Sequence, residues 1–110
     1  MGQTEDLLAT PSALSELIRY QAQAVVSRTI LKNAGGTVTL FAFDEGESLS
    51  EHTSPYDAVI HSVDGEAEVT IAGEAHPLRS GNMLRLPAGK PHGVRAATPC
   101  KLLLIMLKSS

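Results

Sequence analysis

The chain has 110 residues, 43% of them hydrophobic, which is enough apolar material for one compact core and too little for two. The net charge is -3 and the nine lysines and arginines are scattered along the sequence, so nucleic acid is not expected as a partner. Cys100 is the single cysteine. An intramolecular disulfide is therefore excluded, and we expect Cys100 to be a small core residue.

The sequence also argues against a membrane protein. The first twenty residues contain Glu5, Asp6 and Glu16 and no long apolar stretch, which is unlike a signal peptide. The longest apolar run, residues 102–107, is far shorter than the roughly 20 residues that cross a bilayer. We therefore expect a soluble, cytoplasmic protein with no membrane partner.

Residues 1–23 are predicted to form an N-terminal tail and a short helix. Thr10 can cap free amides, and Pro11 is tolerated at the first position of a helix. Leu14, Leu17 and Ile18 then follow at helical spacing. This pattern predicts about two turns of helix packed against the outside of a β-sheet.

Residues 24–110 are predicted to form a single β domain. Runs rich in β-branched and alternating residues are separated by glycine, proline and Asx turns. The expected strands cover residues 24–31, 37–43, 52–63, 66–71, 74–79, 83–86, 92–97 and 101–108. The last of these lacks alternation, which is typical of a strand buried on both faces. Many short strands at close spacing indicate an all-β sandwich or barrel.

Two stretches each hold one histidine at a fixed distance from turn residues. In the first, Gly46 is followed after five residues by His52, and Ser54 lies two positions further on. Three residues separate Ser54 from Ala58, and six separate Ala58 from Gly65. We predict that this histidine points into the barrel.

The second stretch begins with a glycine and contains a proline-rich loop. Five residues separate Gly81 from Pro87, which begins the sequence Pro-Ala-Gly. Gly89 ends that sequence, His92 follows after two more residues, and Ala96 comes after three more. Prolines lack the donor of a strand ladder, so residues 87–91 are expected to form a shaped loop before the strand of His92.

These two motifs resemble those of the cupin family, and they span residues 46–96. The resemblance implies a jelly-roll, or double-stranded β-helix, barrel. Metal-binding cupins use two histidines and a glutamate from the first motif and one histidine from the second. Here Ser54 stands in place of the second histidine and Ala58 in place of the glutamate, so His52 and His92 are the two ligands that remain.

Strand alternation predicts which side chains share the interior with these histidines. The predicted ligand-binding pocket consists of His52, Ser54, Ala58, Ile60, Ser62, His92 and Val94. Asp57 has the opposite parity and would enter only through a bulge near Pro55. The position of Arg85 relative to the pocket stays open at this level.

Three classes of function remain open. The first, which we favour, is a small-molecule-binding cupin whose organic ligand lies between His52 and His92. The second is a metal-dependent enzyme of the dioxygenase, isomerase or lyase type, with an incomplete ligand set that water or substrate completes. The metal would be zinc, nickel, iron, manganese or copper, held by the two histidines. The third is a purely structural β-barrel dimer. Without a metal, any catalysis would rest on one histidine as general base.

A homodimer is expected from the first two strands. Residues 24–31 and 37–43 carry apolar side chains on both faces of each strand. In the second stretch, for example, Val38 and Leu40 have one parity and Phe41 and Phe43 have the other. One barrel has only one interior, so the surplus apolar face is expected to meet a second copy of the chain.

Overall fold

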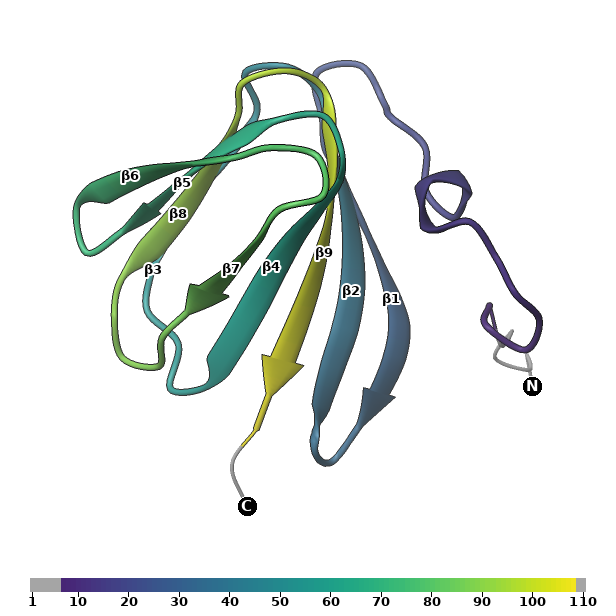
Figure 1. Ribbon diagram of the computed structural model, residues 1–110, viewed down its shortest axis with the longest axis horizontal. Helices are drawn as coiled ribbons and strands as arrows, with labels where there is room; N and C mark the ends of the chain where they lie inside the picture. The colour runs from purple at the N-terminus through teal and green to yellow at the C-terminus, as the bar shows by residue number, and fades with distance from the viewer. Residues whose placement is uncertain (1–6, 109–110) are drawn as a thin grey trace.

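The computed structural model describes residues 7–108, and these form two β-sheets that face one another (Figure 1). The strands in chain order are β1 (Val25–Asn33), β2 (Gly36–Phe43), β3 (Ser48–His52), β4 (Asp57–Asp64), β5 (Ala67–Ile71), β6 (Glu74–Leu78), β7 (Met83–Leu86), β8 (His92–Ala96) and β9 (Cys100–Leu107). The chain is therefore all-β in its described part, as predicted.

The connections between the strands are those of a jelly roll. One sheet has the order β1-β2-β9-β4-β7, which we call the five-stranded sheet, and the other has the order β3-β8-β5-β6. Each adjacent pair is antiparallel. Strands far apart in the sequence lie side by side, such as β2 with β9 and β3 with β8 (Figure 1). The pairing of β3 with β8 brings the two histidine motifs together.

The main core lies between the sheets and is built by alternate residues of each strand. Phe41 pairs with Leu102 and Phe43 with Cys100, so these four side chains share the inner face of the five-stranded sheet. The buried members of this core are Phe43, Ala58, Ile60, Ala67, Val69, Leu78, Leu86, Val94, Ala96, Cys100 and Leu102. Cys100 is fully buried, and burial, together with the Asp64 carboxylate, raises the pKa of its thiol to about 11. It is a core residue, as expected.

The N-terminal segment is not the two-turn helix that the sequence predicts. It contains one turn of 3-10 helix, Leu14–Glu16, whose N-cap Ala13 makes no side-chain capping bond. Side chains from the sheet satisfy the backbone instead: Lys101 donates to the Ser15 carbonyl and Arg28 to the Leu17 carbonyl. These two carbonyls are groups that a longer helix would use for its own hydrogen bonds. No helix in residues 7–108 has the length and apolarity to cross a membrane.

A second apolar cluster fixes this segment to the outer face of the five-stranded sheet. Its buried residues are Ile18, Leu40 and Ala42, with Leu14, Leu17, Val26, Ile30, Val63 and Leu103 packed around them. The segment therefore covers the part of the outer face nearest the start of β1. The outer-facing residues of β9, such as Lys101 and Leu103, are nevertheless only half-buried, and Leu107 is exposed, so this strand is not buried on both faces as the sequence predicted.

The single strand predicted over residues 52–63 is two strands. β3 ends at His52, β4 begins at Asp57, and residues 53–56 form the connection between the two sheets. Pro55 lies in this connection and has no amide hydrogen for a ladder. The backbone amide of Tyr56 instead donates to the Ser54 hydroxyl. The alternation from His52 to Ala58 that the sequence suggested is therefore interrupted, although Ala58, Ile60 and Ser62 do face inward.

Candidate functional site

His52 and His92 are neighbours on the inner side of the four-stranded sheet. They are register partners of the antiparallel pair β3 and β8. Their ring centroids are 4.5 Å apart and the rings meet edge to face at 67°. His92 is buried, with 8% of its surface exposed, whereas His52 is exposed. One imidazole thus lies inside the barrel and the other at its mouth.

The two rings form the polar part of an otherwise apolar cavity of about 100 Å³. The lining residues are Phe41, Phe43, Leu49, His52, Ile60, Leu86, His92, Val94, Leu102 and Leu104. They come from both sheets, so the cavity lies between the sheets. None of these ten described residues is a lysine, arginine, aspartate or glutamate.

The cavity includes some of the predicted pocket residues and not others. His52, Ile60, His92 and Val94 line it, whereas Ser54, Ala58 and Ser62 do not. Ser62 is fully buried and donates its hydroxyl hydrogen to the Gly65 carbonyl at 2.7 Å, so it closes a turn. Ser54 belongs to the connection after β3, where its hydroxyl accepts from the Tyr56 amide. Ala58 is packed into the core behind the cavity.

Asp57 and Arg85, whose positions the sequence left open, both lie outside the cavity. The Asp57 carboxylate accepts a hydrogen bond from the Ala88 amide at 2.9 Å and one from Arg85 at 3.2 Å. These bonds, the amide first, hold the pKa of Asp57 below its usual range. The Gly89 amide also donates to the Ser54 carbonyl. Both loops that border the histidine pair, residues 53–56 and 87–91, are thereby tied in place.

Sequence reasoning missed six of the lining residues. Phe41 and Phe43 come from β2, Leu102 and Leu104 from β9, and Leu49 and Leu86 from β3 and β7. In β2 and β9 both parities are apolar, so alternation does not reveal which side faces inward. Leu49 lies three residues before His52, so alternation would place the two on opposite faces. A register shift between them in β3 allows both to line the cavity.

Both imidazoles are fixed in the same tautomer by the backbone. The Nδ1 atom of His52 lies 3.0 Å from the Ser50 carbonyl oxygen, and that of His92 lies 3.3 Å from the Lys90 carbonyl oxygen. A carbonyl oxygen only accepts, so each Nδ1 carries a hydrogen and donates it. In the neutral ring the Nε2 atom is then an acceptor. The hydrogen bonds of the two rings within residues 7–108 are made by Nδ1, and neither Nε2 is a buried acceptor without a partner.

This donor set does not fit the four-ligand metal site of the metal-binding cupins. Two Nε2 lone pairs suit a transition metal, and a backbone carbonyl on Nδ1 is a common outer contact of a metal-bound histidine. However, no group of three or more histidine, cysteine or acidic side chains comes together in the described part of the chain. Among the residues that line the cavity, no carboxylate balances the charge of a divalent ion.

The environment of His92 favours its neutral form. Burial is the larger cause and the neighbouring His52 the second, and together they lower the pKa of His92 below its ordinary value of 6.5. The hydrogen bond to the Lys90 carbonyl opposes this change, with a smaller effect. At neutral pH the buried ring therefore remains an uncharged hydrogen-bond acceptor.

The low pKa of His92 predicts a loss of stability in acid. As pH falls below 6.5, His92 takes up a proton in the unfolded chain before it does so in the folded chain. The folded state then binds fewer protons, so the free energy of unfolding decreases as pH falls. We expect the decrease to be complete below the pKa of the folded state, and to be limited because the exposed His52 leaves solvent at the cavity mouth. Urea unfolding of the wild type and of His92→Gln at several pH values measures the difference. Because the other titrating groups are shared, a difference that stays constant with pH would contradict the prediction.

The two facing sheets, the jelly-roll connections and an interior site between β3 and β8 define a double-stranded β-helix protein. Comparison with known families agrees with this class: the model of the cupin domain matches residues 39–106. The chain belongs to the cupin family. A curated relative, the polyketide synthase CurC of Streptomyces cyaneus, is 36% identical over 61 residues, which are 54% of this chain. The matched region spans only 40% of that relative.

Solved structures resemble the chain over nearly its whole length. The SPY1581 protein of unknown function from Streptococcus pyogenes is 28% identical, with a TM-score of 0.90 over 100% of this chain and 97% of that one. A cupin superfamily protein from Desulfitobacterium hafniense is 28% identical, with a TM-score of 0.89 over 98% and 100%. A cupin 2 conserved barrel domain protein from Leptotrichia buccalis is 35% identical, with a TM-score of 0.83 over 86% of this chain and 46% of that one.

Proposed function

We propose that the protein binds a small, largely apolar organic molecule in the cavity between His52 and His92. The observation that carries the proposal is the cavity itself, whose walls are apolar except for two imidazoles with centroids 4.5 Å apart. An apolar hollow with a few convergent polar groups is the usual composition of a small-molecule site. The name of the CurC relative, a polyketide synthase, is consistent with an organic ligand. The cytoplasmic location expected from the sequence is part of this proposal.

A fragment screen monitored by protein NMR tests the proposal. We expect neutral single-ring compounds to shift the amide signals of β3, β8 and the other cavity-lining segments. Leu49→Trp places a larger side chain in the cavity wall, and we expect it to abolish these shifts. Leu31→Trp is the matched control, because Leu31 lines a separate depression on the outer face of the five-stranded sheet. Shifts that are lost in the Leu31 variant and kept in the Leu49 variant would contradict the proposal.

A metal-dependent enzyme of the dioxygenase, isomerase or lyase type is the alternative function. The shared tautomer of the two histidines favours it, because both Nε2 atoms are acceptors. The missing carboxylate opposes it, and non-haem iron sites in particular use two histidines with one. Metal analysis of the untagged protein distinguishes the alternatives: a stoichiometric transition metal supports the enzyme, and its absence after purification in metal-supplemented medium supports the ligand-binding protein.

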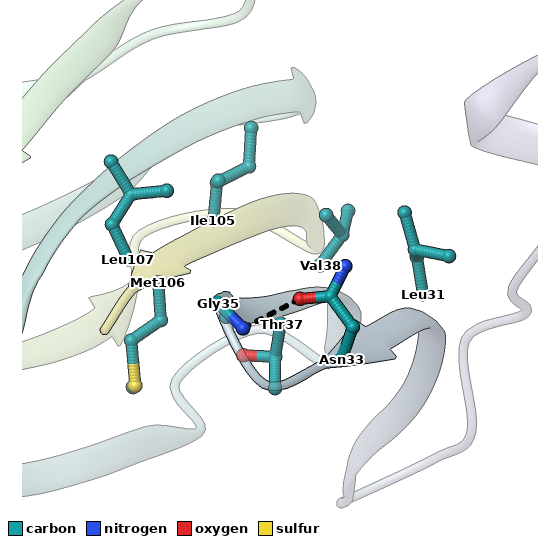
Figure 2. A pocket seen from close by; sticks show the side chains of 9 residues that line it. Leu31, Asn33, Gly35, Thr37, Val38, Ile105, Met106 and Leu107 are labelled. Atoms are coloured by element: carbon teal, nitrogen blue, oxygen red, sulfur yellow. Dashed lines mark hydrogen bonds between the residues drawn. The ribbon is translucent and has the colours of Figure 1, made fainter. Parts of the chain in front are cut away.

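We also propose that a second copy of the chain covers the outer face of the five-stranded sheet. An apolar depression of about 250 Å³ lies on this face, beyond the N-terminal segment (Figure 2). Leu31 and Leu107, which line it, are 57% and 60% exposed, and Val38 and Ile105 lie between them. The charged neighbours at the far edge, Asp57 and Arg85, pair with each other. A face of this kind meets its own copy without repulsion between like charges.

Sedimentation tests the dimer. We expect the wild type to sediment as a dimer and Leu31→Glu with Leu107→Glu to sediment as a folded monomer. Both leucines are exposed in the single chain, so the substitutions should change its free energy of unfolding by less than about 0.5 kcal/mol each. Ala75→Glu on the other sheet is the matched control and should leave the dimer intact. A wild type that remains monomeric at high concentration would refute the interface.

A further inference from the structure

The cavity combines two hydrogen-bond acceptors with no donor. Both Nε2 atoms are acceptors because both Nδ1 atoms donate to backbone carbonyls, at 3.0 Å for His52 and 3.3 Å for His92. The other eight lining residues are apolar. A ligand that covers these two acceptors must therefore bring its own hydrogens, because an acceptor that becomes buried without a donor costs free energy.

We propose that the ligand is a neutral molecule that presents two neighbouring hydroxyl groups from an apolar frame, with each hydroxyl donating to the Nε2 atom of one histidine. This inference rests on the proposed function and adds the chemical class of the ligand. A single hydroxyl satisfies one acceptor only, since it has one hydrogen. Because the rings of His52 and His92 are direct neighbours, two adjacent hydroxyls can reach one ring each.

Other ligand classes match the cavity less well. A carboxylate or phosphate brings only acceptors, and no cationic side chain lines the cavity to receive it. An ammonium group supplies enough hydrogens, but no acidic side chain lines the cavity to balance its charge. A sugar carries hydroxyls on all sides, and the walls formed by Phe41, Phe43 and Leu104 would leave most of them without partners.

The size of the cavity limits the buried part of the ligand. Its volume is about 100 Å³. A dry protein cavity of about 150 Å³ holds benzene, so this smaller cavity encloses only part of a ring or a short branched chain. His52 is exposed at the mouth, so a larger ligand would extend outward past this residue. The dihydroxyl group would lie at the boundary between the buried and exposed parts.

A methylation series of one aromatic frame tests the proposal directly. Catechol, guaiacol and veratrole carry two, one and no hydroxyl hydrogens, and benzoate is the anionic comparison. We titrate them into the full chain by NMR with EDTA present, at a pH about one unit above the ordinary imidazole pKa. Because a neutral hydrogen bond contributes modestly, we expect each methylation to weaken binding about three- to tenfold, and benzoate to bind more weakly than catechol.

Variants then assign the effect to the histidines. His52→Phe and His92→Phe keep a planar ring and remove one acceptor each. We expect each variant to reduce the preference for catechol over veratrole, which is the ratio of their dissociation constants, about three- to tenfold. His52 is exposed, so its variant remains informative if the His92 variant does not fold.

The binding measurements separate an error in the ligand class from an error in the proposed function. If veratrole or benzoate binds in the cavity as tightly as catechol, the ligand class is wrong and the cavity is still a binding site. The same conclusion follows if the Phe variants keep the full preference, or if catechol binds only when a metal is added. If no probe shifts the signals of the lining residues, the proposed function fails and this inference fails with it.

Discussion

Restoring two family residues is expected to create a metal site. We expect the double variant Ser54→His with Ala58→Glu to bind zinc or nickel at least about a hundredfold more tightly than the wild type, a gain of at least about 2.7 kcal/mol. The wild type offers two imidazoles, whereas the variant adds a third imidazole and a carboxylate that balances charge. Competition with a chromophoric chelator measures the affinity.

The expected gain in metal affinity depends on which side chains of β4 face inward. Ala58 faces inward and is buried, whereas Val59 pairs with Arg85 on the opposite face of the same strand. Without metal, a glutamate at position 58 is a buried and unpaired charge, so we expect the double variant to melt below the wild type. Metal that binds only the folded state should then raise the melting temperature of the variant and not that of the wild type.

A matched variant checks that the inward position causes this effect. Ser54→His with Val59→Glu introduces the same two side chains, but its carboxylate belongs to the outer face of the sheet. We expect this variant to bind metal no more tightly than Ser54→His alone. If the two double variants bind metal equally, the side chain at position 58 does not reach the histidines, and the correspondence with the metal-binding cupins fails.

The fold was predictable because its turns depend on residues with distinctive backbone requirements. Asp64-Gly65 marks the turn between β4 and β5, and Gly65 has a φ of 76°. The proline-rich stretch before His92 marks a loop for an equally local reason. The spacing of such residues predicted most of the turns, but the pairing of His52 with His92 also depends on a register shift in β3.

The absence of a two-turn N-terminal helix was not predictable, because the backbone partners of this segment are distant in the sequence. Leu14, Leu17 and Ile18 have helical spacing, and all three do pack on the sheet. The hydrogen bonds that a second turn would need are replaced by Lys101 and Arg28, which belong to strands that the local pattern does not connect to this segment. Tertiary contacts thus override local propensity here.

The composition of the cavity was only partly predictable for a related reason. Alternation identifies the inward residues of β4 because its outward residues differ from them, as Asp57 differs from Ala58. It does not distinguish Phe41 from Leu40 in β2, because that strand is covered on one face by the core and on the other by the N-terminal segment. Alternation predicts which face a side chain is on but not which atoms it contacts. It therefore predicted that Ser62 faces inward, but not that its hydroxyl donates to the Gly65 carbonyl.

Replacing Gly65 by alanine is expected to be strongly destabilising. A Cβ atom at this position would lie 2.1 Å from the Pro99 carbonyl oxygen and 2.9 Å from the Cys100 Cα atom. Both contacts are backbone, so the turn after β4 and the turn before β9 must move apart. We expect Gly65→Ala to lose more than about 3 kcal/mol of unfolding free energy, a large part of the roughly 5 to 15 kcal/mol typical of a domain.

Gly73→Ala separates this steric effect from the backbone strain that both substitutions share. Gly73 has a φ of 83°, close to the 76° of Gly65, but a Cβ atom there meets nothing within 4 Å. We expect Gly73→Ala to lose only about 1 to 2 kcal/mol, the cost of a left-handed conformation for an alanine. Urea unfolding of both variants gives the comparison. Equal losses would mean that the two turns do not approach as closely as described, and the glycine that ends the first cupin motif would then be needed for its φ alone.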